Sequence, residues 1–264
     1  MSCVANLGLK KVDMFNGLYS SASALNMNLH QQDLIAHNLA HVNVHGFKRS
    51  LQTVSTFEDF LPQGMQPNDP EAPETTMNID GSRIVDQVTD FSQGRIEDTG
   101  DPLNVALNGN GFFVVQGQDG PLYTRNGNFK LNENSELCLA GGQVVQGEGG
   151  PIQINDVNSL KIYQDGTVMV NDAEVGRLQA VNFDPVQDLV PAGTTLFLAP
   201  PELNPQPIER GAIQFQQGHL EMSNTQAVNE LIRMIAGMRH FEAAQKSLTT
   251  ISESISKHTS LQSA

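Results

Sequence analysis

Residues 31–50 read QQDLIAHNLAHVNVHGFKRS, and this stretch contains the signals that decide the fold. Its apolar residues first recur three and four positions apart, which is the spacing of one helix face. These residues are Leu34, Ile35, Leu39 and Val42. Asn43 and Gly46 then favour the end of the helix, because both residue types tolerate left-handed backbone geometry. We expect Phe47 to fold back on the helix end, and Lys48 and Arg49 to favour its negative pole.

The same spacing extends toward the N-terminus and predicts a long helix within residues 15–58. The positions on its face are Phe15, Leu18, Ala22, Leu25, Leu29, Gln32, Ala36 and Leu39. A second seam near the C-terminus predicts a helix within residues 217–258. Its positions are Ala227, Leu231, Met234, Met238, Phe241, Gln245, Leu248, Ser252 and Ile255. We expect the two helices to pair in a coiled-coil-like shaft, with Gln32 and Gln245 setting the register.

A further apolar stripe accompanies each seam. Its members are Ile35 and Val42 near the N-terminus, and Val228, Ile232, Ile235, Ala244 and Ile251 near the C-terminus. One narrow seam against one partner helix gives little stability after the entropy cost of ordering a long chain segment. We therefore expect these helices to bury surface against neighbouring chains, and to gain their order on assembly.

Residues 83–215 are expected to form an all-β domain, because short apolar runs alternate with turn signals. The runs are LNVAL (103–107), GFFVV (111–115), LKIY (160–163), TVMV (167–170) and TLFLA (195–199). The turn signals, which supply positive φ in hairpins, are Asp119-Gly120, Asn126-Gly127, Gly141-Gly142 and Asp165-Gly166. An antiparallel barrel or sandwich fits this pattern.

Proline-rich stretches at 62–74 and 200–211 interrupt regular structure, because proline lacks a backbone donor and fixes φ. We expect a linker over residues 59–82, with disordered tails at 1–14 and 259–264. The expected fold class is α+β, with paired long terminal helices and an all-β middle domain.

The net charge of −14 argues against a nucleic-acid partner, which requires a basic face. The charge is unevenly distributed. Residues 1–50 hold two acidic and four basic side chains, residues 220–264 hold four of each, and the middle therefore carries −16. Nearly neutral ends can lie beside copies of themselves without strong repulsion.

Two cysteines, Cys3 and Cys138, provide no disulfide framework. The N-terminal residues MSCVANLGLKKVDMF lack the order of charged and apolar segments found in a secretory signal peptide. No run approaches the ~20 apolar residues of a membrane span. We expect a cytoplasmic protein, or one exported without a cleaved signal, and no membrane insertion.

Asp33, His37, His41 and His45 recur at four-residue spacing and form the strongest candidate for a metal site. His45 precedes a glycine and is expected beyond the helix end, so His37 and His41 remain as the metal-binding alternative to solvated or interface histidines. Catalytic and nucleotide-binding motifs are absent, and the glycines of 108–114 miss the G-x-G-x-x-G spacing. A carboxylate pair for glycan hydrolysis is the enzyme alternative. We expect no enzyme activity, no cofactor and no bound metal.

Three segments together resemble the rod and hook proteins of the bacterial flagellar basal body. The segment LIAHNLAHVNVHGFKRS resembles the N-terminal signature of that family, with His37 and His41 in place of two asparagines. LNVALNGNGFFVVQ and the following YTRNGNFKLNENSELCLAGGQVVQGEGGPI are similar to its β-domain core, with Asn104 replacing an aspartate and Ser135 a turn glycine. GHLEMSNTQAVNELIRMIAGMRHFEAAQKSL is similar to the C-terminal helix, including its Leu-Glu-x-Ser-Asn start.

The resemblance implies a structural subunit of the basal-body rod that assembles into a helical axial tube and transmits torque. A distal rod or hook-type subunit of the same family is the alternative. The implied partners are copies of the chain, neighbouring rod proteins and the flagellar export apparatus. The expected assembly interface comprises Leu18, Ala22, Leu25, Leu29, Asn38, Leu39, Val42, Asn43, Gly46, Phe47, Leu231, Met234, Ile235, Met238, Phe241 and Leu248.

Overall fold

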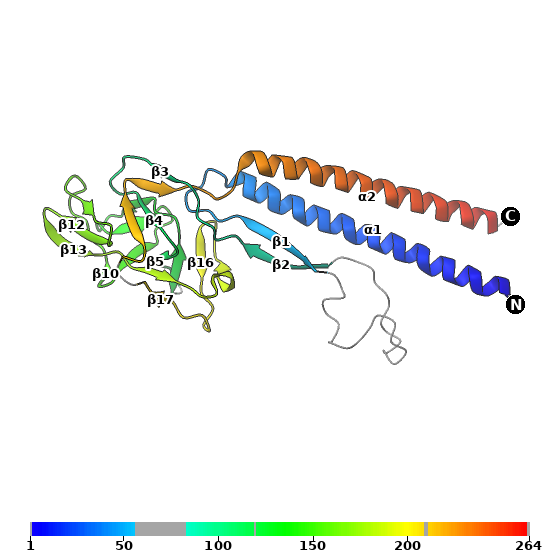
Figure 1. Ribbon diagram of the computed structural model, residues 1–264, viewed down its shortest axis with the longest axis horizontal. Helices are drawn as coiled ribbons and strands as arrows, with labels where there is room; N and C mark the ends of the chain where they lie inside the picture. The colour runs from blue at the N-terminus through cyan, green and yellow to red at the C-terminus, as the bar shows by residue number, and fades with distance from the viewer. Residues whose placement is uncertain (1, 56–82, 119, 209–210, 263–264) are drawn as a thin grey trace. The chain divides into compact units, whose positions relative to one another are not determined.

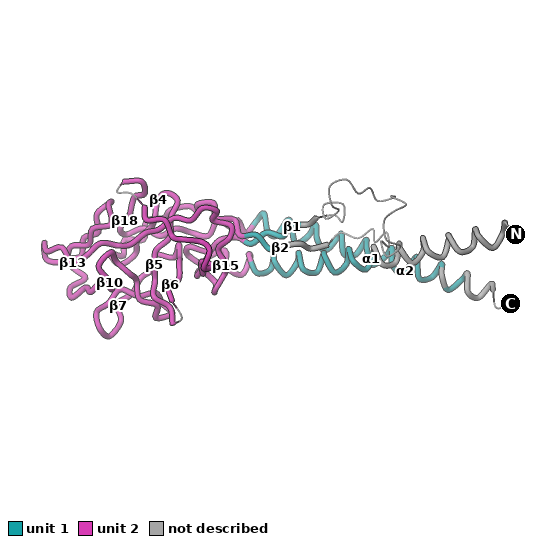
Figure 2. Tube along the Cα trace, turned by 90° about the horizontal axis from the view of Figure 1, so that it is seen from below, with its two compact units in different colours: residues 1–37, 50–88, 228–264 teal, residues 38–49, 89–227 magenta. Residues whose placement is uncertain are grey.

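The computed structural model describes residues 2–55, 83–118, 120–208 and 211–262. The chain divides into two compact units (Figure 2). Unit 1 comprises residues 1–37, 50–88 and 228–264, and unit 2 comprises residues 38–49 and 89–227. The expected linker at 59–82 lies outside the described residues.

Unit 1 contains two long helices and a two-stranded sheet. Helix α1 spans Ser2–Ala40 and helix α2 spans Ala227–Gln262. Strands β1 (Ser50–Ser55) and β2 (Arg83–Thr89) pair with each other. The two helices run side by side in opposite directions (Figures 1 and 2). A Cβ atom placed on Gly237 of α2 would lie 3.6 Å from Cγ of Gln32 of α1, so these two residues face each other.

Burial along the helices corrects the expected seam by one position at several places. On α1 the covered positions are offset from the predicted Ala22, Leu29 and Ala36, which are exposed. One row of buried or half-buried positions on α1 is Ser21, Leu25, Asn28, Gln32, Ile35 and Leu39, and Ser23, Ala24, Met27 and Leu34 beside it are half-buried as well. The corresponding row on α2 is Met234, Gly237, Phe241, Ala244, Leu248 and Ile251. Both rows keep the heptad spacing, but polar and small residues occupy several of their positions, which the apolar pattern could not reveal.

The helix boundaries also differ from those expected. α1 begins at Ser2 rather than near residue 15, and it ends at Ala40, before a turn over residues 41–46. The segment expected to begin the C-terminal helix at residue 217 instead forms strand β19 (His219–Glu221) and a short connection to α2. Alternation over so few residues is too short to separate a strand from a helix.

Unit 2 is built on a ten-stranded antiparallel sheet, as the all-β expectation required. Its main path runs β15-β16-β6-β5-β9-β8-β7, while β10 pairs with β9 and β14 pairs with β5 and β17. The strands are β5 (Phe112–Gln116), β6 (Pro121–Thr124), β7 (Phe129–Leu131), β8 (Leu137–Leu139), β9 (Val144–Gly147), β10 (Gly150–Pro151), β14 (Ala180–Asn182), β15 (Val190–Pro191), β16 (Leu196–Leu198) and β17 (Gln206–Pro207).

Three smaller sheets complete unit 2. One joins β11 (Lys161–Ile162), β12 (Thr167–Val170) and β13 (Ala173–Arg177) in that order. β18 (Gln214–Gln217) pairs with β4 (Val105–Asn108), and β19 pairs with β3 (Ile96–Asp98). A single turn of 3-10 helix, η2, spans Val186–Asp188. Strands from the end of unit 2 thus return to pair with strands from its beginning.

Two apolar clusters fill unit 2. The larger one surrounds Phe113, Phe129 and Phe215, with Phe113 and Phe129 in edge-to-face contact at 5.0 Å between ring centroids. The smaller one surrounds Phe112 and Phe197. Adjacent residues Phe112 and Phe113 point to opposite faces of β5, so one strand contributes to both clusters.

The hairpin glycines mostly confirm the turn signals. Gly120, Gly142 and Gly166 have positive φ, at 144°, 85° and 87°. Gly127 does not, and its role is close approach, because a Cβ there would lie 1.7 Å from the Val105 carbonyl oxygen. Ser135 has a φ of 59°, a left-handed geometry that glycine adopts more readily than serine. Among the described helices, none is both long and apolar enough to cross a membrane.

Candidate functional site

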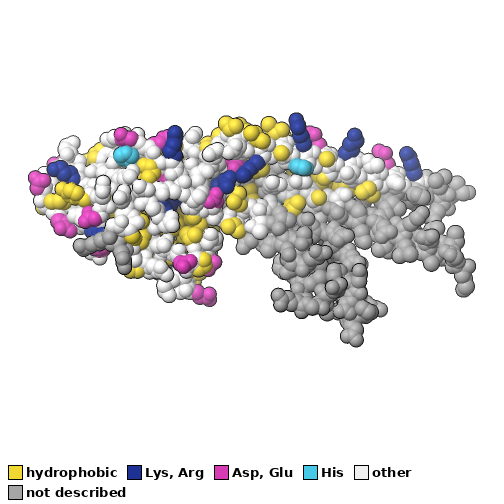
Figure 3. Space-filling model, in the orientation of Figure 1, with side chains coloured by type: hydrophobic (Ala, Val, Ile, Leu, Met, Phe, Trp, Pro, Cys, Tyr) yellow, Lys and Arg dark blue, Asp and Glu magenta, His cyan; other side chains and the backbone are white. Residues whose placement is uncertain are grey.

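An exposed apolar row lies along the first turns of α2 and is called here the α2 stripe. Its residues recur at positions i, i+3, i+4, i+7 and i+10, so they share one face of the helix. They are Val228 (68% exposed), Leu231 (46%), Ile232 (61%), Ile235 (51%) and Met238 (44%). Figure 3 shows these apolar side chains gathered over the beginning of α2. Soluble chains rarely leave so many large apolar side chains together in water without a partner.

A cluster of charged and amide side chains inside unit 2 is called here the clasp; it comprises Lys48, Asp90, Arg125, Glu221 and Asn224. Lys48 and Glu221 form its centre, with 2.6 Å between Nζ and Oε1 and both side chains at 0% exposure. Lys48 Nζ also donates to the Ser92 carbonyl oxygen at 2.8 Å. Lys48 therefore belongs to a buried ion pair. Its position in the sequence had suggested an interaction with the negative pole of the helix, and this expectation is wrong.

Glu221 is the acceptor that the clasp shares. Its Oε1 also accepts from the Gly94 backbone N–H at 2.8 Å, and its Oε2 lies 3.4 Å from Nη1 of Arg125. The Arg125 guanidinium in turn stacks over the Phe112 ring, with Cζ 5.2 Å from the centroid. One carboxylate thus balances two buried cations, and removing it would leave both uncompensated.

Asn224 and Asp90 tie the neighbouring backbone into the clasp. Asn224 Oδ1 accepts from the Arg49 N–H at 2.8 Å, and Asn224 Nδ2 donates to the Asp90 carbonyl oxygen at 2.7 Å. The Asp90 carboxylate accepts from Arg49 Nη2 at 3.0 Å. Arg49, like Lys48, is thus engaged in unit 2.

Burial sets the acid–base properties of the clasp. Desolvation lowers the pKa of Lys48 below its ordinary 10.5; the charge of Glu221 opposes this, and the charge of Arg125 adds to it. Desolvation likewise lowers the pKa of Arg125, again against Glu221. Partial burial would raise the pKa of Asp90, but hydrogen bonds from Ser92 and Arg49 outweigh it and lower that pKa.

The turn before Lys48 fits the clasp through two features of the quoted stretch. Gly46 has the predicted positive φ, at 69°, although α1 already ends at Ala40, and its N–H donates to the Glu221 carbonyl oxygen at 2.7 Å. A Cβ on Gly46 would lie 2.4 Å from the Asn126 nitrogen. Phe47 is 2% exposed and stacks on His41 at 5.0 Å. Asn43, in contrast, does not adopt positive φ.

The residues expected to form the assembly interface separate into groups. On α2, Leu231, Ile235 and Met238 are exposed, whereas Met234, Phe241 and Leu248 are half-buried. On α1, Leu29 and Ala22 are exposed and Leu25 is half-buried, while the Leu18 side chain lies outside the described ones. In unit 2, Asn38, Gly46 and Phe47 are buried, Leu39 and Val42 are half-buried, and Asn43 is exposed.

The histidine alternative receives no support from the structure. His37 is exposed and His41 lies against Phe47. Across the part of the chain that the structure describes, no three His, Cys, Asp or Glu side chains come close enough to hold a metal ion.

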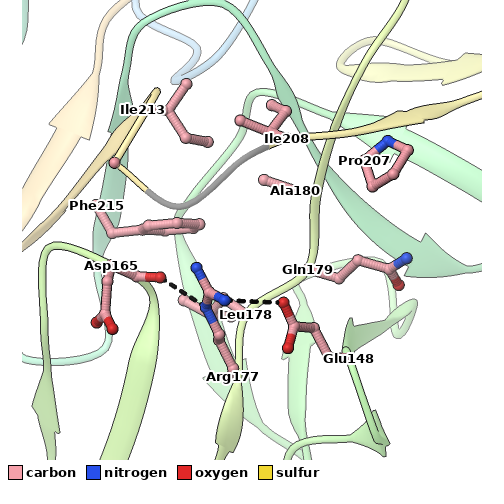
Figure 4. Close-up of a pocket in the computed structure, with 11 residues that line it drawn as sticks. Glu148, Asp165, Arg177, Leu178, Gln179, Ala180, Pro207, Ile208, Ile213 and Phe215 are labelled. Carbon is pink, nitrogen blue, oxygen red and sulfur yellow. Dashed lines mark hydrogen bonds and ion pairs between the residues drawn. The ribbon is translucent and has the colours of Figure 1, made fainter.

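A pocket in unit 2 bears on the hydrolase alternative (Figure 4). Its walls include Ile208, Ile213 and Phe215, and Arg177 extends into it. Arg177 pairs with the Glu148 carboxylate at 3.0 Å and donates to the Asp165 carbonyl oxygen at 2.8 Å. The Asp165 carboxylate accepts from the N–H and hydroxyl of Thr167. Both carboxylates of this pocket are therefore already engaged within the chain, which does not favour a catalytic pair.

Sequence reasoning missed Glu221, Asn224 and Asp90 as functional residues. Glu221 was visible only as an acidic residue between Leu220 and Met222, in the Leu-Glu-x-Ser-Asn start of the C-terminal segment. An acid between two apolar residues usually lies on the exposed face of a strand, and its buried partner, 173 positions away, cannot be read from spacing.

Two parts of the chain match models of known protein families. Residues 106–170 match the family described as Flagellar hook protein FlgE/F/G D1 domain, and residues 216–261 match Flagellar basal body rod FlgEFG protein C-terminal. The first match lies inside unit 2, and the second begins in β18 and includes Glu221 and the α2 stripe.

Relatives align over almost the whole chain. The flagellar basal-body rod protein FlgG of Buchnera aphidicola subsp. Baizongia pistaciae is 32% identical over 92% of this chain and 98% of its own length. FlgF of Caulobacter vibrioides is 32% identical over 91% and 95%, and FlgG of Bacillus subtilis is 31% identical over 91% and 96%. This chain belongs to the flagellar rod and hook protein family.

Proposed function

We propose that this protein is a structural subunit of the flagellar basal-body rod and assembles through the α2 stripe with copies of itself and with neighbouring rod proteins. The relatives named basal-body rod proteins support the rod. The observation that carries the mode of assembly is the stripe, in which five large apolar side chains each remain at least 44% exposed.

The stripe has the properties of a protein interface. Full burial of an exposed side chain of this kind contributes about 1.5–3 kcal/mol. Each of the five is still 44–68% exposed, so together they can supply part of that energy several times over. The C-terminal segment holds four acidic and four basic residues, so copies can approach without net repulsion. The occupant of the stripe is therefore a helix of a neighbouring subunit rather than nucleic acid or membrane.

The two helical rows support a coiled-coil-like shaft as the part of the subunit that enters the assembly. Each row keeps heptad spacing, and the small Gly237 opposite Gln32 allows a large polar side chain within the seam. With that row facing α1, the stripe is left for other subunits. Asn38, Gly46 and Phe47, already buried within unit 2, then support the fold of that unit rather than the interface.

Head-to-tail contacts that do not close a ring generate a helical tube, and a tube of such subunits can transmit torque. Within the rod we favour the proximal segment over the distal one, because the segments PLNVAL, GEGGPI and RHFEAAQK resemble the proximal rod protein more. The family resemblance also supports export through the flagellar apparatus.

The test replaces one stripe residue. Leu231→Asp should prevent incorporation into the rod and abolish swimming, because assembly would bury an unpaired charge. Val190→Asp is the matched control, since Val190 is 50% exposed but lies on β15 of unit 2. It should leave incorporation intact. Normal rods containing Leu231→Asp subunits would refute the placement of the interface on this stripe.

A further inference from the structure

The chain passes between its two units at residues 37/38, 49/50, 88/89 and 227/228. Three of these passages adjoin the clasp in the sequence: Lys48 comes shortly before the second, Asp90 follows the third, and Asn224 comes shortly before the fourth. The first passage opens the segment 38–49, which ends in Lys48 and Arg49. Any force that reaches unit 2 through the backbone therefore arrives at segments that the clasp holds.

Hydrogen bonds and ion pairs join these segments directly to one another. Glu221, before the passage to α2, binds Gly46 through its carbonyl oxygen and Lys48 through its carboxylate. Between Arg49 and Asp90, the Asp90 N–H donates to the Arg49 carbonyl oxygen at 2.8 Å, and the two side chains pair at 3.0 Å. Asn224 then connects the Arg49 N–H to the Asp90 carbonyl oxygen.

The remaining contacts connect the clasp to the β-sheet region of unit 2. Arg125 follows β6 and contacts both Glu221 and the Phe112 ring. Met222 N–H donates to the Arg95 carbonyl oxygen at 2.8 Å, and Gly94 leaves no space for a side chain, since a Cβ would lie 1.9 Å from the Met222 carbonyl oxygen. Because the Lys48–Glu221 and Arg125–Glu221 pairs are buried, water cannot replace them gradually as the segments separate.

We propose that the clasp is the force-transmitting joint of the subunit, through which load on the terminal helices passes into unit 2. The proposal rests on the proposed function, because a rod subunit carries torque. The resistance of the clasp to force is nevertheless a property of a single chain and can be measured without assembly. Pulling the two chain ends apart loads residues 38–49 against residues 219–227, and Lys48–Glu221 is the buried ion pair between these two segments.

The experiment pulls single full-length molecules by handles on the two ends and measures how fast unit 2 opens at fixed force. Lys48→Met should raise the opening rate by about 100-fold, the change expected when a buried pair loses one partner. Arg177→Met is the matched control, because it breaks the Arg177–Glu148 ion pair. The Glu148 side chain is 57% exposed, and neither residue lies near a point where the chain passes between the units. Arg177→Met should change the rate by less than about threefold.

A second matched pair covers the case in which Lys48→Met prevents folding. Asn224→Ala removes the amide that joins Arg49 to Asp90 but leaves the ion pairs, and it should raise the opening rate about tenfold. Its control, Asn132→Ala, removes an amide of similar exposure that bonds within its own turn, to Asn134 and Glu136. Asn132→Ala should leave the opening rate near that of the unaltered chain.

Equal opening rates for Asn224→Ala and Asn132→Ala would overturn the proposal, as would a Lys48→Met molecule that opens like the unaltered chain. The proposed function fails by different results: absence of the unaltered chain from intact rods would overturn the rod role, and normal incorporation of Leu231→Asp would overturn the interface on the α2 stripe. The two tests are therefore independent.

Discussion

At the scale of single residues, two separable features require glycine at position 46. Its φ of 69° disfavours any side chain, and its close approach to Asn126 leaves no space for one. Gly100 provides the matched control, because its φ is 68° but nothing lies within 4 Å of a Cβ built there.

Gly46→Ala should therefore cost several kcal/mol of unfolding free energy, whereas Gly100→Ala should cost only ~1–2 kcal/mol for left-handed geometry. Urea denaturation of the two variants measures the difference. Equal losses would mean that backbone geometry alone explains Gly46, and that the contact with Asn126 contributes nothing.

Lys48 gives the clasp a distinct pH dependence. Its folded-state pKa is lowered, so the folded chain binds fewer protons than the unfolded chain between that lowered value and 10.5. The free energy of unfolding should then rise with pH through this alkaline window, as the penalty for burying the ammonium is relieved.

The readout is the difference between the unaltered chain and Lys48→Met, followed by urea denaturation from pH 7 to 10.5. The raised pKa values of Cys138 and Tyr123, both caused by burial, act in the opposite direction and cancel in that difference. A stability difference that does not change with pH would contradict a Lys48 whose folded-state pKa is lowered by burial.

At the scale of elements, Gly237 lies in the interior of α2 and faces Gln32. A Cβ there would meet Gln32 at 3.6 Å, an ordinary contact distance, so alanine fits. Because glycine costs a helix interior about 1 kcal/mol relative to alanine, Gly237→Ala should raise the stability of the helical unit by up to that amount. Circular dichroism at 222 nm during heating measures this change. A lower melting temperature would indicate that the helices approach more closely here than the structure shows.

The elements also show how far the sequence leads. Hairpin glycines and alternating apolar runs predicted the β unit, because both signals are local. The heptad spacing predicted both helices, but not the face that each turns toward the other. The facing side of each helix includes Asn28, Gln32 or Gly237, and residues of these types do not indicate burial in a sequence. The strand β19 escaped prediction because its pairing with β3 joins segments far apart in the chain.

The clasp illustrates the same limit for the site. Gly46 has the positive φ that the sequence predicted, but α1 already ends at Ala40, and the Gly46 N–H bonds to Glu221. Lys48 was likewise assigned to the helix pole from its position alone. Its true partner, Glu221, is brought to it only by the folded β unit. Long-range ion pairs of this kind leave no periodic trace in a sequence.

At the scale of the whole molecule, the proposed assembly requires neighbouring subunits to cover the α2 stripe. A lone chain leaves Val228, Leu231, Ile232, Ile235 and Met238 in water. Amide hydrogens of weakly supported segments exchange quickly with solvent, whereas those of a packed core exchange slowly. The stripe and β5 should therefore respond differently to assembly.

Hydrogen–deuterium exchange of residues 228–238, compared between dilute monomer and intact rods, tests this claim most directly. We expect fast exchange in the monomer and strong protection in the rod, while β5 (Phe112–Gln116) stays equally protected in both. Full protection of residues 228–238 in the dilute monomer, unchanged by assembly, would contradict the account.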